Sequence, residues 1–203
     1  MLELFLKGGI LMYPILLCSV LVIAIFCERM VRYAVIRGRG EDIEIRVAKL
    51  MKEGDEEAAL NASKESNSHM GRVLEKAIKA RDLENEVLES VIVNATENEV
   101  RDLSSYLQTL ATIGNIAPLL GLLGTIMGMI KAFMVIQEMG GKVNSAVLAG
   151  GIWEAMLTTA AGLFVALPTM AAHSYLLSKV DRYEARLQNG SVLFLKAIAK
   201  KAA

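Results

Sequence analysis

The side chain with the clearest chemical potential is the carboxyl group of Glu154, which lies in the apolar stretch GGIWEAMLTTAAGLF at positions 150–164. It is the only Asp, Glu, Lys or Arg residue in the segment 143–178. Placing a carboxylate at membrane depth is costly, so an isolated acid there indicates a function or a partner. A carboxyl group shielded from water can also bind and release protons, which is the chemistry that a proton path requires.

Three interpretations of Glu154 remain open at this level. It can lie solvated among the outer lipid headgroups, because it follows the loop glycines by about ten residues and Trp153 is a typical interfacial residue. It can be a buried, protonated group that is hydrogen-bonded to Thr158. It can also line a water-filled path together with the hydroxyl groups of Thr125, Thr158 and Thr159.

Lys131 is the other charged residue at membrane depth. It lies about four turns after Pro118, towards the outer end of its apolar segment. We expect its ammonium group to reach the interface by snorkelling, with an ion pair to Glu154 as the alternative.

Three apolar segments must position these side chains, and each is close to or longer than the roughly 20 residues that span a bilayer. They cover residues 10–27, 104–130 with a continuation after Lys131, and 147–177. The first is followed by a basic flank rather than a cleavage site, so we read it as a retained span and not as a signal peptide. The sequence predicts an all-α integral membrane protein with three transmembrane helices. The expected parts are an N-terminal segment with helix 1 (1–35), a cytoplasmic helical region (36–103), transmembrane helix 2 (104–136), a short periplasmic loop (137–146), transmembrane helix 3 (147–178) and a cytoplasmic C-terminal helix and tail (179–203).

The distribution of Lys and Arg predicts the orientation of these spans. Basic residues follow the first span and the third span, whereas Lys7 alone precedes the first and Lys142 alone lies in the short loop. Because basic flanks favour the cytoplasm, the N-terminus and the short loop are expected outside and the C-terminus inside. The basic flanks consist of Arg29, Arg32, Arg37, Arg39, Lys179, Arg182 and Arg186.

The cytoplasmic region has the composition of a soluble helical domain. We expect two helices that are separated at Gly54, with Asp55 as the N-cap of the second, and a further short helix over residues 70–83. From about Glu84 no breaker precedes the second span, which predicts one helix approaching 50 residues. The third span is expected to continue into the cytoplasm and to end at Gly190, followed by a short amphipathic helix on the membrane or on a neighbour.

Small residues recur at helical spacing in the second and third spans. Such residues let helices approach closely in lipid, where the hydrophobic drive for association is weak. They predict tight packing between these helices or between subunits of an oligomer, which would also shield polar groups from lipid. The small residues proposed for packing or for a pore wall are Gly121, Gly124, Gly128, Gly151, Ala155 and Gly162.

The composition argues against several other classes of protein. Hydrophobic residues make up 54% of the 203 residues, yet the net charge is zero, so nothing favours a nucleic-acid partner. Cys18 and Cys27 form no C-x-x-C motif, and His69 and His173 belong to no ligand-spaced pattern, which argues against a metal site. No P-loop or protease arrangement is present. We therefore expect neither an enzyme nor a cofactor.

Two blocks of sequence carry a resemblance to a known family. LATIGNIAPLLGLLGTIMGMIKAF (110–133) and GGIWEAMLTTAAGLFVALPTMAAHSYL (150–176) resemble the MotA/TolQ/ExbB proton-channel family, and more closely its ExbB/TolQ branch. The resemblance implies a bacterial inner-membrane subunit that forms a ring, generally a pentamer, around a dimer of a single-span ExbD/TolR-like partner. It also implies that the proton-motive force does mechanical work on that partner, which carries the essential Asp, and that a TonB/TolA-like protein receives this work.

The resemblance assigns roles residue by residue. Thr125, Glu154 and Thr159 fall on the pore-facing polar positions, and Pro118 and Pro168 match the two membrane prolines of the family. Thr158 adds a second hydroxyl group, which leaves open which threonine faces the pore. Met156 replaces the usual Leu, and Trp153 and Lys131 lie outside the family pattern.

These observations together predict a proton-channel stator subunit that energises an envelope process such as outer-membrane transport. The alternatives are a non-conducting oligomeric scaffold that recruits cytoplasmic proteins and, with less support, a standalone ion channel. The sequence leaves open which process is driven, and whether the ion is H⁺ or Na⁺.

Overall fold

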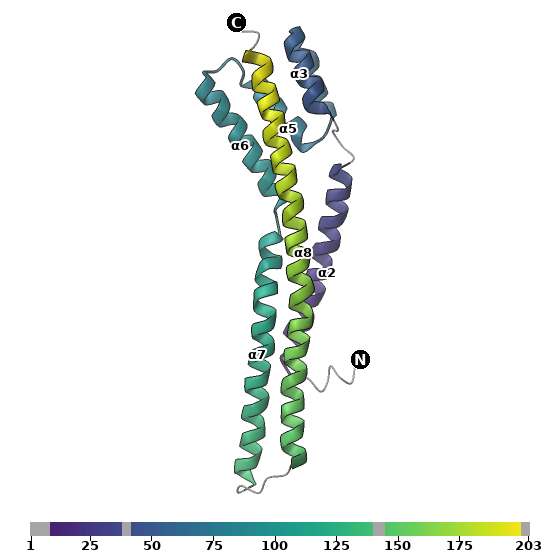
Figure 1. Ribbon diagram of the computed structural model, residues 1–203, viewed down its shortest axis with the longest axis vertical. Coiled ribbons are helices and arrows are strands. Elements are labelled where there is room, and N and C mark those ends of the chain that lie inside the picture. Colours follow the sequence, from purple (N-terminus) through teal and green to yellow (C-terminus); the bar gives the residue numbers. More distant parts are fainter. Residues whose placement is uncertain (1–8, 38–41, 140–144, 200–203) are drawn as a thin grey trace. The chain divides into compact units, whose positions relative to one another are not determined.

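The computed structural model describes residues 9–37, 42–139 and 145–199. Within these ranges the chain is helical, without strands, and divides into two compact units. The first unit comprises Met1–Glu28 and Tyr106–Tyr175, and the second comprises Arg29–Ser105 and Leu176–Ala203. The helices, labelled as in Figure 1, are α2 (Met12–Arg37), α3 (Ile43–Glu53), α4 (Glu56–Glu65), α5 (His69–Lys79), α6 (Asn85–Leu103), α7 (Leu107–Glu138) and α8 (Ser145–Ala199).

Three of the described helices are long and apolar enough to cross a membrane, as the sequence predicted. The candidate spans are Met12–Val35, Leu107–Glu138 and Leu148–Ala199. At 1.5 Å per residue, the 32 residues of α7 extend about 48 Å and the 55 residues of α8 about 80 Å, against a hydrocarbon layer of about 30 Å. Both helices are therefore longer than the layer, and α8 contributes residues to both units.

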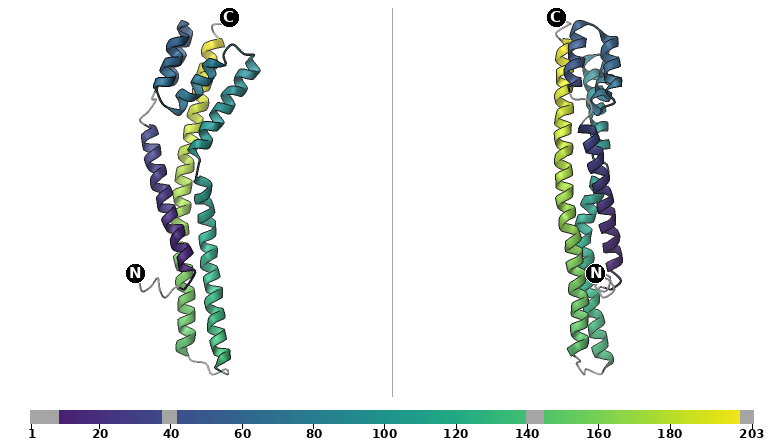
Figure 2. Two further views of the ribbon diagram at one scale, coloured as in Figure 1. Left: turned by 180° about the vertical axis from the view of Figure 1, so that it is seen from behind. Right: turned by 90° about the vertical axis from the view of Figure 1, so that its right-hand side faces the viewer.

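In the first unit, α7 and the N-terminal part of α8 run side by side in every view (Figures 1 and 2). Most large apolar side chains of these two helices point outwards, including Leu119, Phe164 and Leu167, which are 62%, 80% and 66% exposed. Their buried positions are instead held largely by glycine, alanine and threonine. This pattern is typical of helices whose outer surface faces lipid or other helices.

The second unit has an ordinary apolar core. Helices α3, α4, α5 and α6 pack in sequence order, and α3 also contacts α5. The predicted break at Gly54 is confirmed, because this glycine ends α3 in the left-handed conformation with φ 86°. The predicted cap is also confirmed, since the Asp55 carboxylate accepts a hydrogen bond of 3.0 Å from the backbone N–H of Ala58.

The prediction of one uninterrupted helix from Glu84 into the second span is wrong. Helix α6 ends at Leu103 and α7 begins at Leu107 after Tyr106, which has φ 62°. The last carbonyl groups of α6 are occupied by side chains: the Ser105 hydroxyl donates to the Asp102 carbonyl at 2.5 Å and the Tyr33 hydroxyl donates to the Leu103 carbonyl at 2.8 Å. No Gly or Pro marks this break, and Tyr33 belongs to the distant helix α2, so the break could not be predicted from the neighbouring residues.

The prediction that Gly190 ends the third helix is also wrong, as is the separate amphipathic tail helix. Helix α8 continues through Gly190 to Ala199. Gly190 is buried, and a Cβ atom there would collide with the side-chain end of Met70 in α5, so the glycine provides room for packing rather than a helix end. The residues after it, including Phe194 and Ala197, are fully buried in the core of the second unit.

Several positions used in the sequence predictions lie outside the described residues. They are Lys7, Arg39, Lys142 in the short loop, and the final residues 200–203.

Candidate functional site

The contact between α7 and α8 is made by the predicted small residues. A Cβ atom at Gly162 would lie 2.5 Å from the Ala117 carbonyl oxygen, and one at Gly121 would lie 3.0 Å from the Cα atom of Thr159. The distance at Gly162 is shorter than real Cβ atoms show and the one at Gly121 is tighter than most, so the two backbones approach closely and leave little room for a larger residue. The small-residue stripe is therefore used within the chain, between its own second and third spans.

The same close approach continues towards the C-terminal end of α7 and the N-terminal end of α8. A Cβ atom at Gly128 would lie 3.0 Å from that of Ala155, and one at Gly151 would lie 2.7 Å from that of Ala132. Gly124 faces Thr158, whose side chain occupies the space that a Cβ atom at Gly124 would need. All six predicted small residues are thus placed at or near one contact surface.

The two threonines of α8 have different positions in this contact. Thr158 is only 1% exposed, lies against Gly124, and donates a hydrogen bond of 2.8 Å to the backbone carbonyl of Glu154. Thr159 is half-buried and its hydroxyl donates to the Gly121 carbonyl of α7 at 2.9 Å. Thr159 therefore links the two helices by a hydrogen bond, whereas Thr158 fills the space beside a glycine.

The third predicted hydroxyl group, Thr125, lies one turn after Gly121 on α7. It is half-buried and donates to the Leu122 carbonyl of its own helix at 2.6 Å. The structure thus places Thr125 and Thr159 on neighbouring parts of α7 and α8. Pro118 and Pro168 lie inside α7 and α8, the former half-buried and the latter exposed.

Glu154 forms an ion pair across the two helices. The Lys131 ammonium lies 3.1 Å from Oε1 of Glu154, with 55% and 29% of the two side chains exposed. Of the two expectations for Lys131, snorkelling was favoured from the sequence, and the structure shows the pair instead. The same carboxylate oxygen lies beside Gly9, which precedes α2. Three separate segments therefore meet at Glu154.

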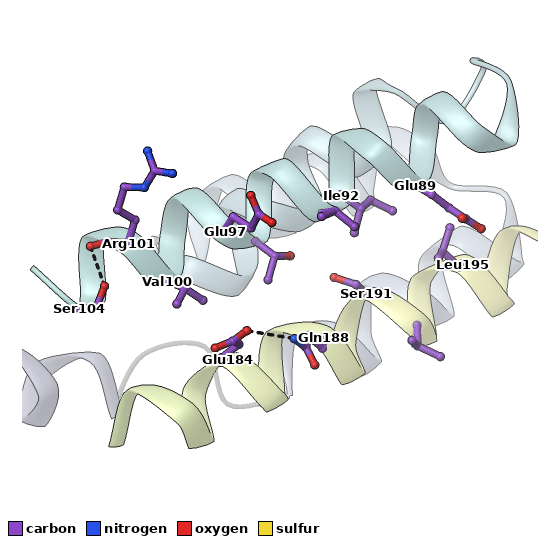
Figure 3. Close-up of a pocket in the computed structure, with 13 residues that line it drawn as sticks. Glu89, Ile92, Glu97, Val100, Arg101, Ser104, Glu184, Gln188, Ser191 and Leu195 are labelled. Atoms are coloured by element: carbon purple, nitrogen blue, oxygen red, sulfur yellow. Dashed lines mark hydrogen bonds between the residues drawn. The ribbon is translucent and has the colours of Figure 1, made fainter. Parts of the chain in front are cut away.

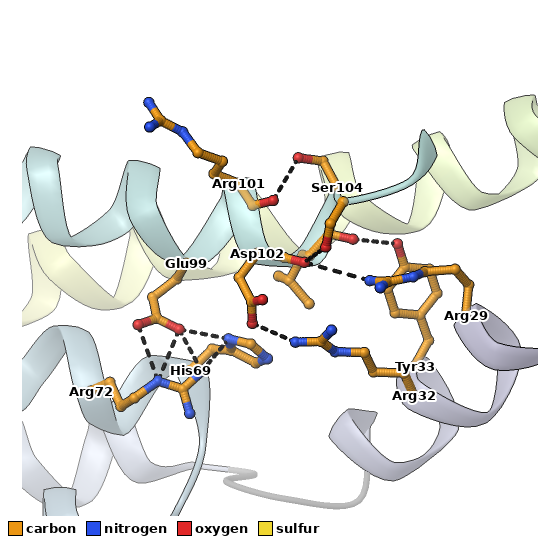
Figure 4. A network of polar contacts seen from close by, with 11 residues as sticks. Arg29, Arg32, Tyr33, His69, Arg72, Glu99, Arg101, Asp102 and Ser104 are labelled. Atoms are coloured by element: carbon orange, nitrogen blue, oxygen red, sulfur yellow. Dashed lines mark hydrogen bonds and ion pairs between the residues drawn. The ribbon is translucent and has the colours of Figure 1, made fainter. Parts of the chain in front are cut away.

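A second polar cluster lies in the second unit, which is called the soluble unit from here on after the soluble composition of its residues 36–103, and was not predicted from the sequence (Figure 4). Glu99 of α6 accepts hydrogen bonds from Arg72 at 2.5 Å and contacts His69 Nδ1 at 2.7 Å. Burial raises the pKa of Glu99, but these hydrogen bonds and the nearby positive charge outweigh it and lower the pKa to about 2. The hydrogen bond to Glu99 in turn raises the pKa of Arg72.

The sequence carried one signal for this cluster. Glu99 follows Ala95 by four residues and precedes Leu103 by four, so it occupies the buried stripe of its helix. An acid on such a stripe requires a partner, although the sequence alone does not identify His69 or Arg72.

The C-terminal end of α2 binds the C-terminal end of α6 (Figure 4). Arg32 forms a 2.5 Å ion pair with the Asp102 carboxylate, and the buried Arg29 donates to the Asp102 carbonyl at 3.5 Å. Together with the hydroxyl of Tyr33, these groups satisfy the end of a helix whose partial negative charge favours cations. The basic residues that the sequence assigned to membrane orientation therefore also fix the break before α7.

The soluble unit also has an open groove of about 600 Å³ between α6 and the C-terminal part of α8 (Figure 3). Its floor is apolar, with Ile92, Val100 and Leu195, and Glu184 and Gln188 are joined by a 3.1 Å hydrogen bond at its side. Among the described residues, no group of three or more His, Cys, Asp and Glu side chains could hold a metal ion.

The fold and the site define a multi-pass helical membrane protein in which two spans pack through small residues and carry few polar groups. Comparison with known proteins identifies the class more closely. A model of the MotA/TolQ/ExbB proton channel family matches residues 65–189, which is more than half of the chain and includes α7 and the predicted site. The chain belongs to this family, which is one of proton channels and is not a known family of enzymes.

Individual relatives agree with this assignment. The chain is 31% identical over 186 residues to the biopolymer transport protein exbB1 of Vibrio cholerae, covering 89% of this chain and 81% of that protein. It is 29% identical over 168 residues to the biopolymer transport protein ExbB of Pseudomonas putida, covering 81% of this chain and 51% of that protein. A shorter match, 40% identical over 92 residues, is to ExbB of Neisseria gonorrhoeae and covers 45% of this chain and 41% of that protein.

Proposed function

We propose that this chain is an inner-membrane stator subunit that couples the proton-motive force to mechanical work on an ExbD/TolR-like partner. The observation that carries the proposal is the family match over α7 and most of α8, which contains every polar group of the site. Energising an envelope process such as outer-membrane transport is consistent with relatives named biopolymer transport proteins. A TonB/TolA-like protein is the proposed recipient of the work.

The proposed topology has the N-terminus and the α7–α8 connection outside and the C-terminus in the cytoplasm. It is supported by the basic residues that follow the first span, such as Arg29 and Arg32, and by those in the cytoplasmic extension of α8, such as Lys179 and Arg182. The proposed assembly is a homopentameric ring around a dimer of the partner. A single chain with three spans encloses little by itself, so a path shielded from lipid requires several copies.

In the proposed path, Thr125, Thr159 and Glu154 supply polar groups along α7 and α8, and the partner's Asp carries the proton. Hydroxyl and carboxylate groups can hold water or a proton where the surrounding helices are apolar. Thr159 is the better candidate of the two neighbouring threonines, because Thr158 is almost fully buried beside Gly124. The close α7–α8 contact gives this path a fixed geometry.

The proposal is tested with Glu154→Ala and Thr159→Val, made separately in the complex with its partner. We expect assembly to survive in both variants, while proton uptake into vesicles and energy-dependent output fall. Thr112→Val is a matched control, because this α7 threonine is exposed and bonds only its own helix at Gln108 among the contacts described. A complex that assembles normally but conducts no protons, with or without these substitutions, would instead support the scaffold.

A further inference from the structure

The Lys131–Glu154 pair joins a residue of the proposed path to one that the family motif does not assign a role. The ammonium donates to Oε1 of Glu154 at 3.1 Å, from α7 to α8. Proton uptake by either carboxylate oxygen removes the negative charge that the Lys131 ammonium faces, although the carboxyl group can still accept a hydrogen bond. The ion pair with Lys131 and proton uptake by Glu154 therefore oppose each other.

The backbone around the pair is held in register. Lys131 directly precedes Ala132, and Glu154 directly precedes Ala155. A Cβ atom at Gly151 would lie only 2.7 Å from that of Ala132, so the two helices cannot slide past one another here without a clash. The pair is thus formed between two helices whose backbones approach closely at the neighbouring residues, although the Lys131 side chain itself is 55% exposed.

A third segment closes the site. Gly9 has φ 72°, a conformation that L-residues with side chains rarely adopt, and a Cβ atom at this position would collide with Oε1 of Glu154. The turn before α2 therefore lies directly against the oxygen that Lys131 binds. The backbone conformation favours glycine at this point, and a larger residue would displace the Glu154 carboxylate.

We propose that Lys131 is a positioning residue that controls when Glu154 is available to protons, with the Gly9 turn as the third wall of the same site. While the pair is closed, Glu154 is a bound counter-charge and takes no part in proton exchange. Opening of the pair admits protons to the carboxylate. This inference rests on the proposed function, and it adds a controlling residue to the outer end of the path.

The main test compares passive proton flux through the reconstituted ring–partner complex in vesicles with an imposed pH gradient. Lys131→Met removes the charge but keeps a long side chain, and we expect flux to rise several-fold. Lys131→Arg keeps the charge and should restore flux close to that of the unsubstituted chain. In the double variant Lys131→Met with Glu154→Gln, the rise should disappear, because Lys131 acts only through the carboxylate.

The Gly9 turn supplies an independent variant. Gly9→Ala should displace the Glu154 carboxylate and raise flux in the same direction as Lys131→Met. Gly150→Ala is the matched control, because a Cβ atom at Gly150 has nothing within 4 Å. Flux in this control should equal that of the unsubstituted chain.

The inference would be overturned if Lys131→Met left flux unchanged, or if its effect persisted without the Glu154 carboxylate. Failure of the proposed function appears differently, as an assembled complex that conducts no protons either unsubstituted or with any of these substitutions. In that case the pair itself is still tested by zero-length carbodiimide coupling of the Lys131 amine to the Glu154 carboxyl group. Absence of that cross-link in the assembled complex would reject the geometry.

Discussion

The helices inside the first unit, the membrane unit, pack together differently from the helices inside the second, soluble unit. In the membrane unit, the contact between α7 and α8 consists of residues such as Gly121, Gly162 and Thr159, while large apolar side chains point outwards. In the soluble unit, residues such as Leu74 and Phe194 are fully buried in a shared core. Lipid removes most of the gain from burying apolar surface, so close shape complementarity replaces it in the first unit.

The buried or half-buried carboxylates of the two units also differ, in their exposure and in the number of their partners. In the membrane unit, Glu154 has one described ion-pair partner and is partly exposed. In the soluble unit, the side chain of Glu99 is only 10% exposed and is bound by both His69 and Arg72. A carboxylate bound from two sides is suited to stability, whereas one that has a single charged partner can exchange that partner for a proton.

The largest effect that follows from this comparison is expected at the α7–α8 contact. Gly162→Leu would place a side chain where even a Cβ atom lies 2.5 Å from a backbone carbonyl, so the two spans would have to separate. We expect loss of the assembled complex in size-exclusion chromatography. Gly150→Leu, at a position with open space, should assemble normally. A Gly162→Leu complex of normal size and yield would show that the contact is dispensable.

A smaller effect, on the stability of the soluble unit, is expected when the pH is lowered. The pKa of Glu99 is lowered to about 2 from an ordinary value of 4.5, so its stabilisation is complete above pH 4.5 and is lost as the pH falls towards 2. The loss should amount to about 3 kcal/mol of unfolding free energy. Amide hydrogen exchange on peptides from α5 and α6 measures it, and Glu99→Gln should remove this part of the pH dependence. An unchanged pH dependence in Glu99→Gln would contradict the assignment.

The smallest effect concerns a single helix cap. Asp55→Ala removes the acceptor for the Ala58 N–H and should cost about 1 kcal/mol of unfolding free energy. Asp55→Asn keeps a good capping side chain and should be nearly neutral. Thermal unfolding followed by circular dichroism compares the two. Equal stability of the alanine and asparagine variants would mean that the cap contributes nothing. As a control, the amide hydrogen exchange of α7 should be unchanged in both variants.

Local patterns were sufficient to predict much of the fold. The apolar runs predicted three candidate spans, Gly54 and Asp55 marked the helix boundary, and the spacing of Gly121, Gly124 and Gly128 predicted a close helix contact. These features depend on residues near one another in the chain. The proton-path roles of Thr125, Thr159 and Glu154 still rest on the family match and stay predictions.

The two wrong predictions of helix ends concern positions where a segment distant in sequence packs against the helix. Tyr33 from α2 donates to the Leu103 carbonyl at the break before α7, and Gly190 lies inside α8 with Met70 from α5 packed against it. Neither partner is visible in the local sequence. A helix boundary or a buried glycine of this kind is decided by packing between elements rather than by propensity.

Glu154 also shows which features follow from the local sequence and which follow from tertiary contacts. The sequence alone determined that Glu154 lies in an apolar helix and that its charge needs an explanation, because desolvation is costly wherever such a helix lies in lipid. Only the tertiary structure decided that Lys131 and the Gly9 turn meet it. The physical reason is that these residues are separated by more than 20 positions, and only the close approach permitted by glycine and alanine brings α7 and α8 near enough for the pair to form.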